Sequence, residues 1–464
     1  MGHGRGGGVG ISIENGVHDV DISFLGCNFT ANHAFVGGGL SVHISGKNDV
    51  QTENITVEIK NSLFKHNGCY QNEHQGLGGG ADLIFTLLDG SGIAKSRVLV
   101  KNVTFTENCG KLGGGVYYYS DRGRAESSNT MLFDQCTFKQ NKAHLGSAVA
   151  MTPSLFLKSS SGYTINAKFQ NCYFLENNVF VNDSHTHKIQ PSTAGLGTIY
   201  ASFYDIHFQG YSYFENNWGS AVYIINGVAN FLNSSASFVN NTSLQGGAVA
   251  LVGSSMMIVG PNNYEFINNM AIYEGGALYV LMTDSTDFIS SRSCFIQYRD
   301  NDTVKVLLSG EWNANITFVG NRAKAGHAIY ATSLHPCQVV NKGTEKQPNY
   351  RLMNTSDVFT MQGVIFDDDV KLQPQIATDV AVLHNSKSTP LKVIPGERYN
   401  HGVMVTDDLN QIITDPSFRV AVDGQVEDIE LHPGTSAFIG SQIQLVVFCW
   451  SLFPQLIDSS TCMS

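Results

Sequence analysis

The residues best suited to chemistry lie in a few short polar segments. Asp183, His185 and His187 are spaced two residues apart, so a strand there would place both imidazoles on one face. Protein metal sites use three or four ligands, and nothing in the sequence indicates the remaining ones. We therefore expect no metal site and no cofactor.

Polysaccharide cleavage is the other chemistry to consider. Glycoside hydrolysis uses a pair of carboxylates, and the run 367–369 offers three aspartates without a partner segment. A lyase would need calcium held by aspartates beside a basic residue, for which the Asp-Arg-Gly-Arg insertion at 121–124 is the one weak candidate. We interpret both segments as solvated polar loops, so the sequence predicts no catalytic residue.

The elements that would have to position any site are set by a repeated tetrapeptide, Phe-x-x-Asn. A glycine-rich step and then an aliphatic residue follow each copy, as in Gly246-Gly247-Ala248-Val249. A glycine lies three positions before that aliphatic residue in every copy but one, where Leu196 takes its place. Alternation of apolar and polar residues around each Phe indicates short strands. The copies are Phe29/Asn32, Phe64/Asn67, Phe105/Asn108, Phe138/Asn141, Phe174/Asn177, Phe214/Asn217, Phe238/Asn241, Phe266/Asn269 and Phe318/Asn321.

This repeat predicts an all-β chain whose residues 1–337 form a right-handed parallel β-helix solenoid. The copies are 24 to 52 residues apart; the shortest spacings match one coil, and longer ones match a coil with an insertion or two coils. We expect the longest, between Phe266 and Phe318, to contain a degenerate coil around residues 294–298. The phenylalanines should stack inside the tube, and the asparagines should form a hydrogen-bonded structural ladder.

The repeat fades after residue 337. Residues 338–374 read as a linker or an irregular capping coil. From 375 to 448, short β runs alternate with turns such as Pro395-Gly396 and Asp423-Gly424, which is typical of a small β-sandwich-like domain of immunoglobulin-like outline. Residues 449–464 show no continuing pattern, and we expect an unstructured or truncated tail.

Composition excludes several classes of protein. The net charge is −11 and charged residues are 14% of the chain, which argues against a nucleic-acid partner and against general disorder. No stretch reaches the ~18 consecutive apolar residues of a membrane helix. The first ten residues look like the middle of a repeat and lack an apolar signal-peptide core, so we expect an incomplete chain.

Ten Asn-x-Ser/Thr sequons mark possible glycosylation. Alternation around each Phe turns Asn28, Asn102 and Asn315 outward, whereas Asn241 belongs to the ladder and should be buried and unmodified. The glycosylation candidates are Asn28, Asn54, Asn102, Asn182, Asn233, Asn301, Asn315 and Asn354.

Phe-x-x-Asn together with Gly-Gly-Ala-[Ile/Leu/Val] resembles the repeat of the chlamydial polymorphic outer-membrane proteins. The segment 294–337 is similar to related β-helix surface proteins of simple animals. This resemblance covers the solenoid and implies display at the cell surface or secretion, with an adhesion-like role. It names no ligand, and no membrane segment is recognisable in the chain.

The cysteines have two expected roles. Cys27, Cys136 and Cys172 share one inward position two residues before Phe, where free thiols would act as small core residues. Cys294 and Cys337 bracket the last well-formed coil. The resemblance to the animal surface proteins favours a disulfide between them, capping the solenoid; the competing interpretation is two unrelated core thiols.

The function expected from these observations is a non-enzymatic extracellular or cell-surface scaffold. It would be adhesin-like, or a fragment of a receptor ectodomain, and would bind an extracellular glycan or protein ligand. The alternative is a polysaccharide lyase or glycoside hydrolase of the pectate-lyase-like fold, which is motivated by analogy of fold.

Overall fold

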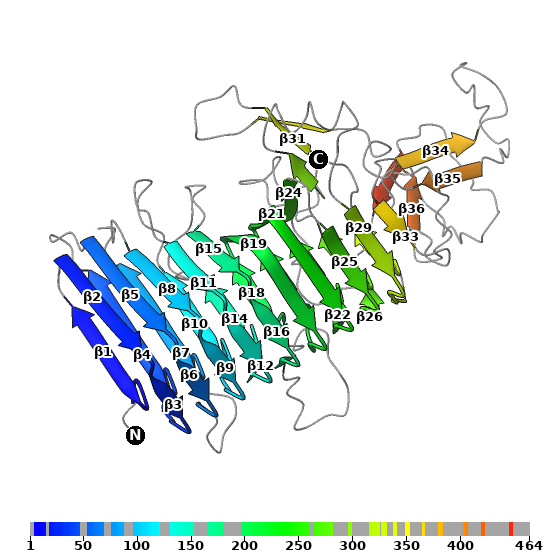
Figure 1. Cartoon of the computed structure of the whole chain (residues 1–464). Coiled ribbons are helices and arrows are strands. Elements are labelled where there is room, and N and C mark those ends of the chain that lie inside the picture. The colour runs from blue at the N-terminus through cyan, green and yellow to red at the C-terminus, as the bar shows by residue number, and fades with distance from the viewer. Residues whose placement is uncertain are drawn as a thin grey trace. The chain divides into compact units, whose positions relative to one another are not determined.

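Short parallel strands, stacked one coil on the next, make up most of the structure (Figure 1). Within the described residues the chain is all-β without a helix, which confirms the predicted parallel β-helix. The computed structural model describes residues 4–14, 18–46, 53–68, 76–87, 96–120, 130–152, 165–179, 196–259, 263–281, 296–298, 315–324, 326–331, 337–340, 349–352, 364–366, 379–383, 402–406, 419–422 and 445–448.

One column of strands is a ten-stranded parallel sheet. After the first strand, each begins at the aliphatic residue that follows a glycine step, and these first residues lie opposite one another in register. In order, the strands are β1 (Val9–Glu14), β4 (Leu40–Gly46), β7 (Ala81–Leu87), β10 (Val116–Ser120), β14 (Val149–Thr152), β18 (Ile199–Ser202), β20 (Val222–Ile225), β23 (Val249–Val252), β27 (Leu278–Leu281) and β30 (Ile329–Ala331).

A second column pairs the strands that precede the nine Phe-x-x-Asn copies, and β31 follows them as a tenth strand. Two of them, β19 and β21, are twelve residues long and run on through the following corner. The column contains β2 (His18–Leu25), β5 (Glu53–Lys60), β8 (Ser96–Lys101), β11 (Thr130–Asp134), β15 (Ile165–Gln170), β19 (Tyr204–Glu215), β21 (Val228–Val239), β24 (Ser255–Val259), β28 (Ile296–Tyr298) and β31 (Cys337–Val340).

A third column carries the phenylalanines themselves. The C-terminal halves of β19 and β21 belong to it, and short strands after the asparagines extend some coils. Its other strands are β3 (Asn28–Thr30), β6 (Leu63–Lys65), β9 (Thr104–Thr106), β12 (Thr137–Lys139), β16 (Tyr173–Leu175), β25 (Asn263–Ile267), β29 (Asn315–Val319) and β33 (Val364–Phe366). The extensions are β13 (Lys142–Ala143), β17 (Asn178–Val179), β22 (Thr242–Gln245) and β26 (Met270–Glu274).

The nine repeated phenylalanines form one uninterrupted stack inside the coils, as predicted. Neighbouring ring centroids are 4.5 to 5.1 Å apart and the rings are close to parallel. This separation is close to the ~4.8 Å between hydrogen-bonded strands, so each ring can keep the conformation of the ring before it. All nine rings are buried. They are Phe29, Phe64, Phe105, Phe138, Phe174, Phe214, Phe238, Phe266 and Phe318.

The nine asparagines form the predicted ladder beside the rings. In each step the side-chain Nδ2 donates to the Oδ1 of the next asparagine at 2.8 to 3.1 Å. The backbone N–H donates to the same oxygen. From Asn67 onward, Nδ2 also donates to the carbonyl of the Phe in the preceding coil. The ladder consists of Asn32, Asn67, Asn108, Asn141, Asn177, Asn217, Asn241, Asn269 and Asn321.

The two ends of the ladder differ from its middle. Asn108, an interior member, is fully buried, and its Oδ1 accepts two bonds from Asn67 while its Nδ2 donates to Asn141 and to the Phe64 carbonyl. Asn32 begins the ladder and is only half-buried, so it is the exception to an otherwise buried row. Asn321 is buried and accepts both bonds from Asn269, and its Nδ2 donates to the Phe266 carbonyl. A ladder asparagine therefore makes its full set of bonds only where another ladder asparagine lies in the coil on each side of it.

Glycines occupy the corner before the ten-stranded sheet because the backbone there is left-handed. At Gly37, for example, φ is +64°, and a Cβ atom would lie 2.4 Å from the carbonyl oxygen of Leu40. The exception at Leu196 has a simple cause: Gly197 takes the left-handed position with φ +66°, and its coil is one residue shorter between this corner and Ile199.

The expectation of an additional coil between Phe266 and Phe318 is wrong. These rings stack directly, with centroids 4.9 Å apart, and β25 pairs with β29. Strand β28, in the segment expected to form that coil, pairs with β24 and therefore belongs to the coil that ends at Phe318. The Phe stack shows that every spacing between copies is a single coil, so the longer spacings reflect insertions.

Beyond residue 337 the solenoid sheet continues. Strand β33 pairs in parallel with β29 and places Phe366 opposite Phe318, while β31 forms an antiparallel pair with β32 (Asn349–Leu352). The segment expected to be a linker or capping coil therefore supplies strands to the solenoid.

The chain divides into two compact units, Met1–Gln373 and Pro374–Ser464. In the second unit, β34 (Asp379–Leu383) pairs antiparallel with β35 (Gly402–Thr406). A second antiparallel pair joins β36 (Arg419–Val422) and β37 (Leu445–Phe448). The expected tail, 449–464, lies outside the described residues.

Asn177→Ala should destabilise the solenoid by about 3 kcal/mol or more. The change leaves the Phe138 carbonyl and both nitrogens of Asn141 without the bonds that Asn177 provides. Chemical denaturation followed by circular dichroism would measure the loss. Asn178→Ala is the matched control because its side chain is exposed; equal midpoints for the two variants would contradict the structural role of the ladder.

Candidate functional site

Stacking of the coils also aligns side chains on their outer surface. One such row consists of the residues that come directly before the ladder asparagines in the sequence. His66, Glu107, Gln140 and Glu176 each have a left-handed backbone, with φ between 53° and 55°. Residues other than glycine and asparagine lose roughly 1–2 kcal/mol in this conformation. Neighbouring coils fix the backbone at this corner, so it accepts side chains of different types.

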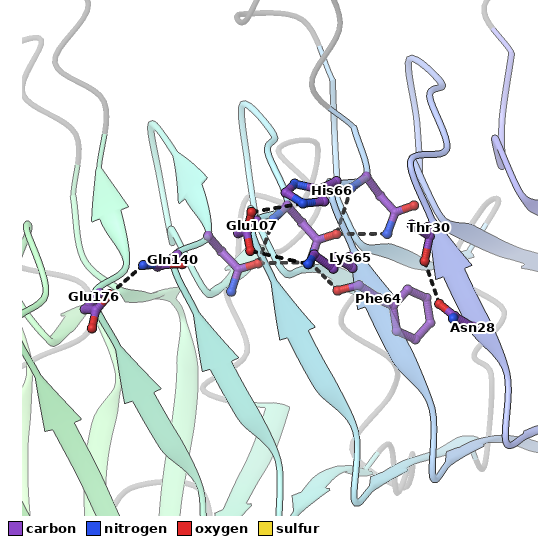
Figure 2. Close-up of polar contacts among 11 residues, drawn as sticks. Asn28, Thr30, Phe64, Lys65, His66, Glu107, Gln140 and Glu176 are labelled. Carbon is purple, nitrogen blue, oxygen red and sulfur yellow. Dashed lines mark hydrogen bonds and ion pairs between the residues drawn. The ribbon is translucent and has the colours of Figure 1, made fainter.

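Contacts between successive coils run along this row, as Figure 2 shows. The Nε2 atom of His66 lies 3.0 Å from Oε2 of Glu107, and Nζ of Lys65 lies 3.9 Å from the other carboxylate oxygen. Farther along, Nε2 of Gln140 donates to Oε2 of Glu176 at 2.6 Å. Because the row is largely exposed, these pairs contribute little to stability and leave polar groups available for a ligand.

The predicted ladder residues are structural and lie apart from this outer row. Asn108 and Asn321 are buried, and Asn32 is half-buried at the first step. Their amide groups are bonded to neighbouring asparagines. The ladder therefore positions the outer residues, while its own amides are hydrogen-bonded to the adjacent coils.

A group of tyrosines projects from the third column of strands. Tyr211 and Tyr213 are two residues apart in β19, and Tyr173 of β16 lies opposite Tyr213. The ring centroid of Tyr213 is 6.5 Å from that of Tyr173 and 6.2 Å from that of Tyr211. Tyr173 and Tyr211 are 41% and 39% exposed, so accessible aromatic surface gathers at this point of the coils.

Polar partners border these rings on the next two coils. The Tyr211 hydroxyl donates to Oγ of Ser237 at 3.1 Å, and the Ser237 hydroxyl in turn donates to Oε2 of Glu265 at 2.8 Å. We call Tyr173, Tyr211, Tyr213, Ser237 and Glu265 the tyrosine platform. Its hydrogen-bond relay fixes the ring of Tyr211 and ends in an exposed carboxylate that can accept further bonds.

Partial burial raises the pKa of Tyr213, and the charge of Glu215 adds to this effect. The phenol is therefore neutral at physiological pH. It offers a hydrogen-bond donor as well as an aromatic face.

A buried carboxyl lies on the ten-stranded sheet. Asp82 accepts a hydrogen bond from Oγ of Ser41 at 3.2 Å, and its other oxygen has no hydrogen-bond partner. Burial raises the pKa of Asp82 to about 8, against smaller opposing effects of Ser41 and the positive charge of Arg5. Arg5 also contacts Nδ1 of His43. A carboxyl that holds a proton near neutral pH has the property of a general acid.

The core cysteines are free thiols. Cys136 and Cys172 are fully buried and Cys27 is half-buried. The Sγ atoms of Cys136 and Cys172 lie 3.3 and 3.6 Å from backbone carbonyl oxygens one coil earlier. Burial, together with the neighbouring Cys172 thiol, raises the pKa of Cys136 well above its usual value, which disfavours the reactive thiolate.

The capping disulfide stays a prediction. Cys337 lies opposite Gln297 in the β28–β31 pair, while Cys294 is outside the described residues. Cys109, for which the sequence suggested no role, is disulfide-bonded.

The sequons fall into three groups. Asn28, Asn54, Asn102, Asn240 and Asn315 have exposed side chains, whereas Asn241 is buried in the ladder. The side chain of Asn233, in β21, is not described, and Asn182, Asn301 and Asn354 lie outside the described residues.

The other segments that the sequence suggested for chemistry also lie outside the described residues. They are the His185/His187 pair with Asp183, the 121–124 insertion and the 367–369 aspartates. Among the described residues, no three or more His, Cys, Asp or Glu side chains gather as metal ligands would.

Sequence reasoning missed the tyrosine platform and Asp82. A signal for the first was present, because Tyr173 and Tyr213 both stand directly before the Phe of consecutive repeats. Asp82 is the second residue of β7, directly after Ala81. It lies opposite Tyr117 of the next coil. Alignment of the copies would have shown both positions, but not which of them is buried.

The described residues contain no helix long and apolar enough to cross a membrane. Comparisons with protein-family models, curated proteins and solved structures find no match to this chain.

Asp82→Asn should make stability less dependent on pH. With a folded pKa of about 8 against an ordinary 3.8, the native state retains a proton that the unfolded chain releases. Stability therefore falls as pH rises between these values. At pH 8 the free energy of unfolding of the variant should exceed that of the wild type by a few kcal/mol. Urea unfolding at pH 5 and pH 8 would test this. The exposed Asp21→Asn is the control, and an unchanged pH dependence in Asp82→Asn would contradict the assignment.

The thiols should differ in reactivity. Iodoacetamide at pH 8, followed by mass spectrometry of the native protein, should modify half-buried Cys27 and leave Cys136 and Cys172 unmodified until the chain is unfolded. Burial keeps the reagent away from both thiols, and the raised pKa of Cys136 also disfavours its thiolate. A native Cys136–Cys172 disulfide, or equal labelling of all three, would refute their role as reduced core residues.

Proposed function

We propose that the protein is a non-enzymatic extracellular or cell-surface scaffold that binds ligands along the outer faces of its coils. The tyrosine platform is the observation that carries this proposal. Large aromatic side chains exposed together on a soluble surface are typical of binding sites, because their burial on association is favourable. An adhesin-like protein or a receptor ectodomain would use such a surface.

The construction of the solenoid supports a binding role. Its interior is already packed and hydrogen-bonded: the phenylalanine rings stack on one another, and the ladder asparagines bond to one another. The outer rows can vary without disturbing that interior. Extended repeat surfaces of this kind suit ligands that make several contacts along their length.

An extracellular location is supported by the sequons and the repeat. Asn28, Asn54, Asn102 and Asn315 present exposed amides, as a glycosylated protein requires. The similarity of the repeat to bacterial and animal surface proteins points to the same compartment.

A second candidate function is polysaccharide cleavage, which the Asp82 cluster favours. A proton-holding carboxyl beside Arg5 and Ser41 could serve as a general acid in a lyase or a glycoside hydrolase. The complete burial of Asp82 weighs against this role, because a substrate would have to reach the carboxyl.

One pair of assays separates the two functions. A glycan array and a panel of polysaccharide depolymerisation assays should be run on the wild type and on Asp82→Asn. The scaffold proposal predicts binding on the array or to an extracellular protein, without chain shortening by either form. Polysaccharide shortening by the wild type that is lost in Asp82→Asn would overturn the scaffold and establish the enzyme.

A further inference from the structure

We propose that the tyrosine platform binds an uncharged oligosaccharide, with pyranose rings stacked on Tyr173, Tyr211 and Tyr213. This inference rests on the proposed scaffold function and names the class of its ligand. Three observations carry it: the spacing of the rings, the charge around them, and the rigidity of their mounting.

The spacing suits consecutive sugar rings. Tyr211 and Tyr213 lie along one strand with centroids 6.2 Å apart and planes within 23° of parallel. Tyr173, in the neighbouring coil, lies 6.5 Å from Tyr213 with its ring tilted by 59°, so it borders the pair at an angle. An oligosaccharide lying on the platform could therefore place neighbouring pyranose units on neighbouring rings.

The chemistry of the rings matches that of a sugar face. The π face of a tyrosine carries partial negative charge, and the axial C–H groups of a pyranose carry partial positive charge. Their contact also removes apolar surface from water. Tyrosine hydroxyls at the ring edges can exchange hydrogen bonds with the sugar hydroxyls that project sideways.

The surrounding charge selects against acidic glycans. The Glu265 carboxylate is exposed at one border of the platform, and Glu215 lies two residues beyond Tyr213 in β19. Carboxylates accept strong hydrogen bonds from sugar hydroxyls and repel uronates and sulfates. The net charge of −11 acts in the same direction.

The platform is held ready for its ligand. Beneath it, Phe174 and Phe214 stack at 4.5 Å, and Asn177 and Asn217 are joined in the ladder. The Tyr211 ring is fixed through its bond to Ser237. Tyrosine has few rotatable bonds, so ordering it on binding costs little entropy.

The test is calorimetric titration with defined probes. Cellohexaose, chitohexaose and mannohexaose represent neutral chains, a galacturonate hexamer and a heparin hexasaccharide represent acidic ones, and a lysine hexapeptide represents a cationic ligand. We expect at least one neutral chain to bind. Tyr211→Ala and Tyr213→Ala should each weaken that binding about tenfold, whereas Tyr213→Phe, which keeps the ring, should retain most of it.

Tyr273→Ala is the matched control, because this tyrosine is 37% exposed outside the platform; its binding should equal that of the wild type. Circular dichroism would verify that every variant is folded. Failure of all three neutral chains to bind would overturn the inference, as would tighter binding of an acidic chain or of the peptide alone. So would equal binding by platform variants and wild type, although a ligand held elsewhere would leave the scaffold function intact. Shortening of a probe would instead overturn the scaffold function.

Discussion

The constraint on which the structure depends is the hydrogen-bonded asparagine ladder, which repeats at the spacing of one coil. An amide has two donor and two acceptor positions, and Asn177, for example, uses its own on Asn141, Asn217 and the carbonyl of Phe138. A carboxyl group has at most one donor even when it is protonated, and an aliphatic residue would leave the corner backbone unsatisfied. The ladder therefore fixes the left-handed corner and, with it, the position of the Phe that precedes each asparagine.

The same constraint separates the roles of neighbouring residues. Directly before the ladder, the residue has a left-handed backbone but an outward side chain, and it varies from Ala31 to His66, Glu107 and Gln140. The local cost of such residues is tolerated because the coils above and below determine the backbone. The inward Phe and Asn are the same in every repeat, whereas the outward residues differ. Binding specificity can therefore change on the outer surface without loss of the fold.

The tyrosine platform lies where the solenoid departs from strict regularity. Strands β19 and β21 run through a corner at which the corresponding strands of earlier coils end, and their pairing shifts register between Phe208 and Gly210. The coil from Phe214 to Phe238 is also the shortest, since the two residues are 24 positions apart. Without an insertion leaving this part of the coil, Tyr211 and Tyr213 stay on one continuous strand beside Ser237. A regular interior thus supports a local irregularity that exposes aromatic surface.

The sequence by itself determined the fold, because the Phe, Asn and Gly of each repeat recur in one order and each has a single physical role. It also determined that Cys136 and Cys172 face inward, since strand alternation is local. It did not determine that residues 296–298 belong to the coil of Phe318, because insertion and coil have similar lengths in the sequence. Only the tertiary structure decided that Tyr213 adjoins both Tyr173 and Ser237, and that Asp82 is buried. Successive copies of the repeat are 24 to 52 residues apart. Which residues meet across neighbouring coils follows from register and packing, which composition and spacing do not encode.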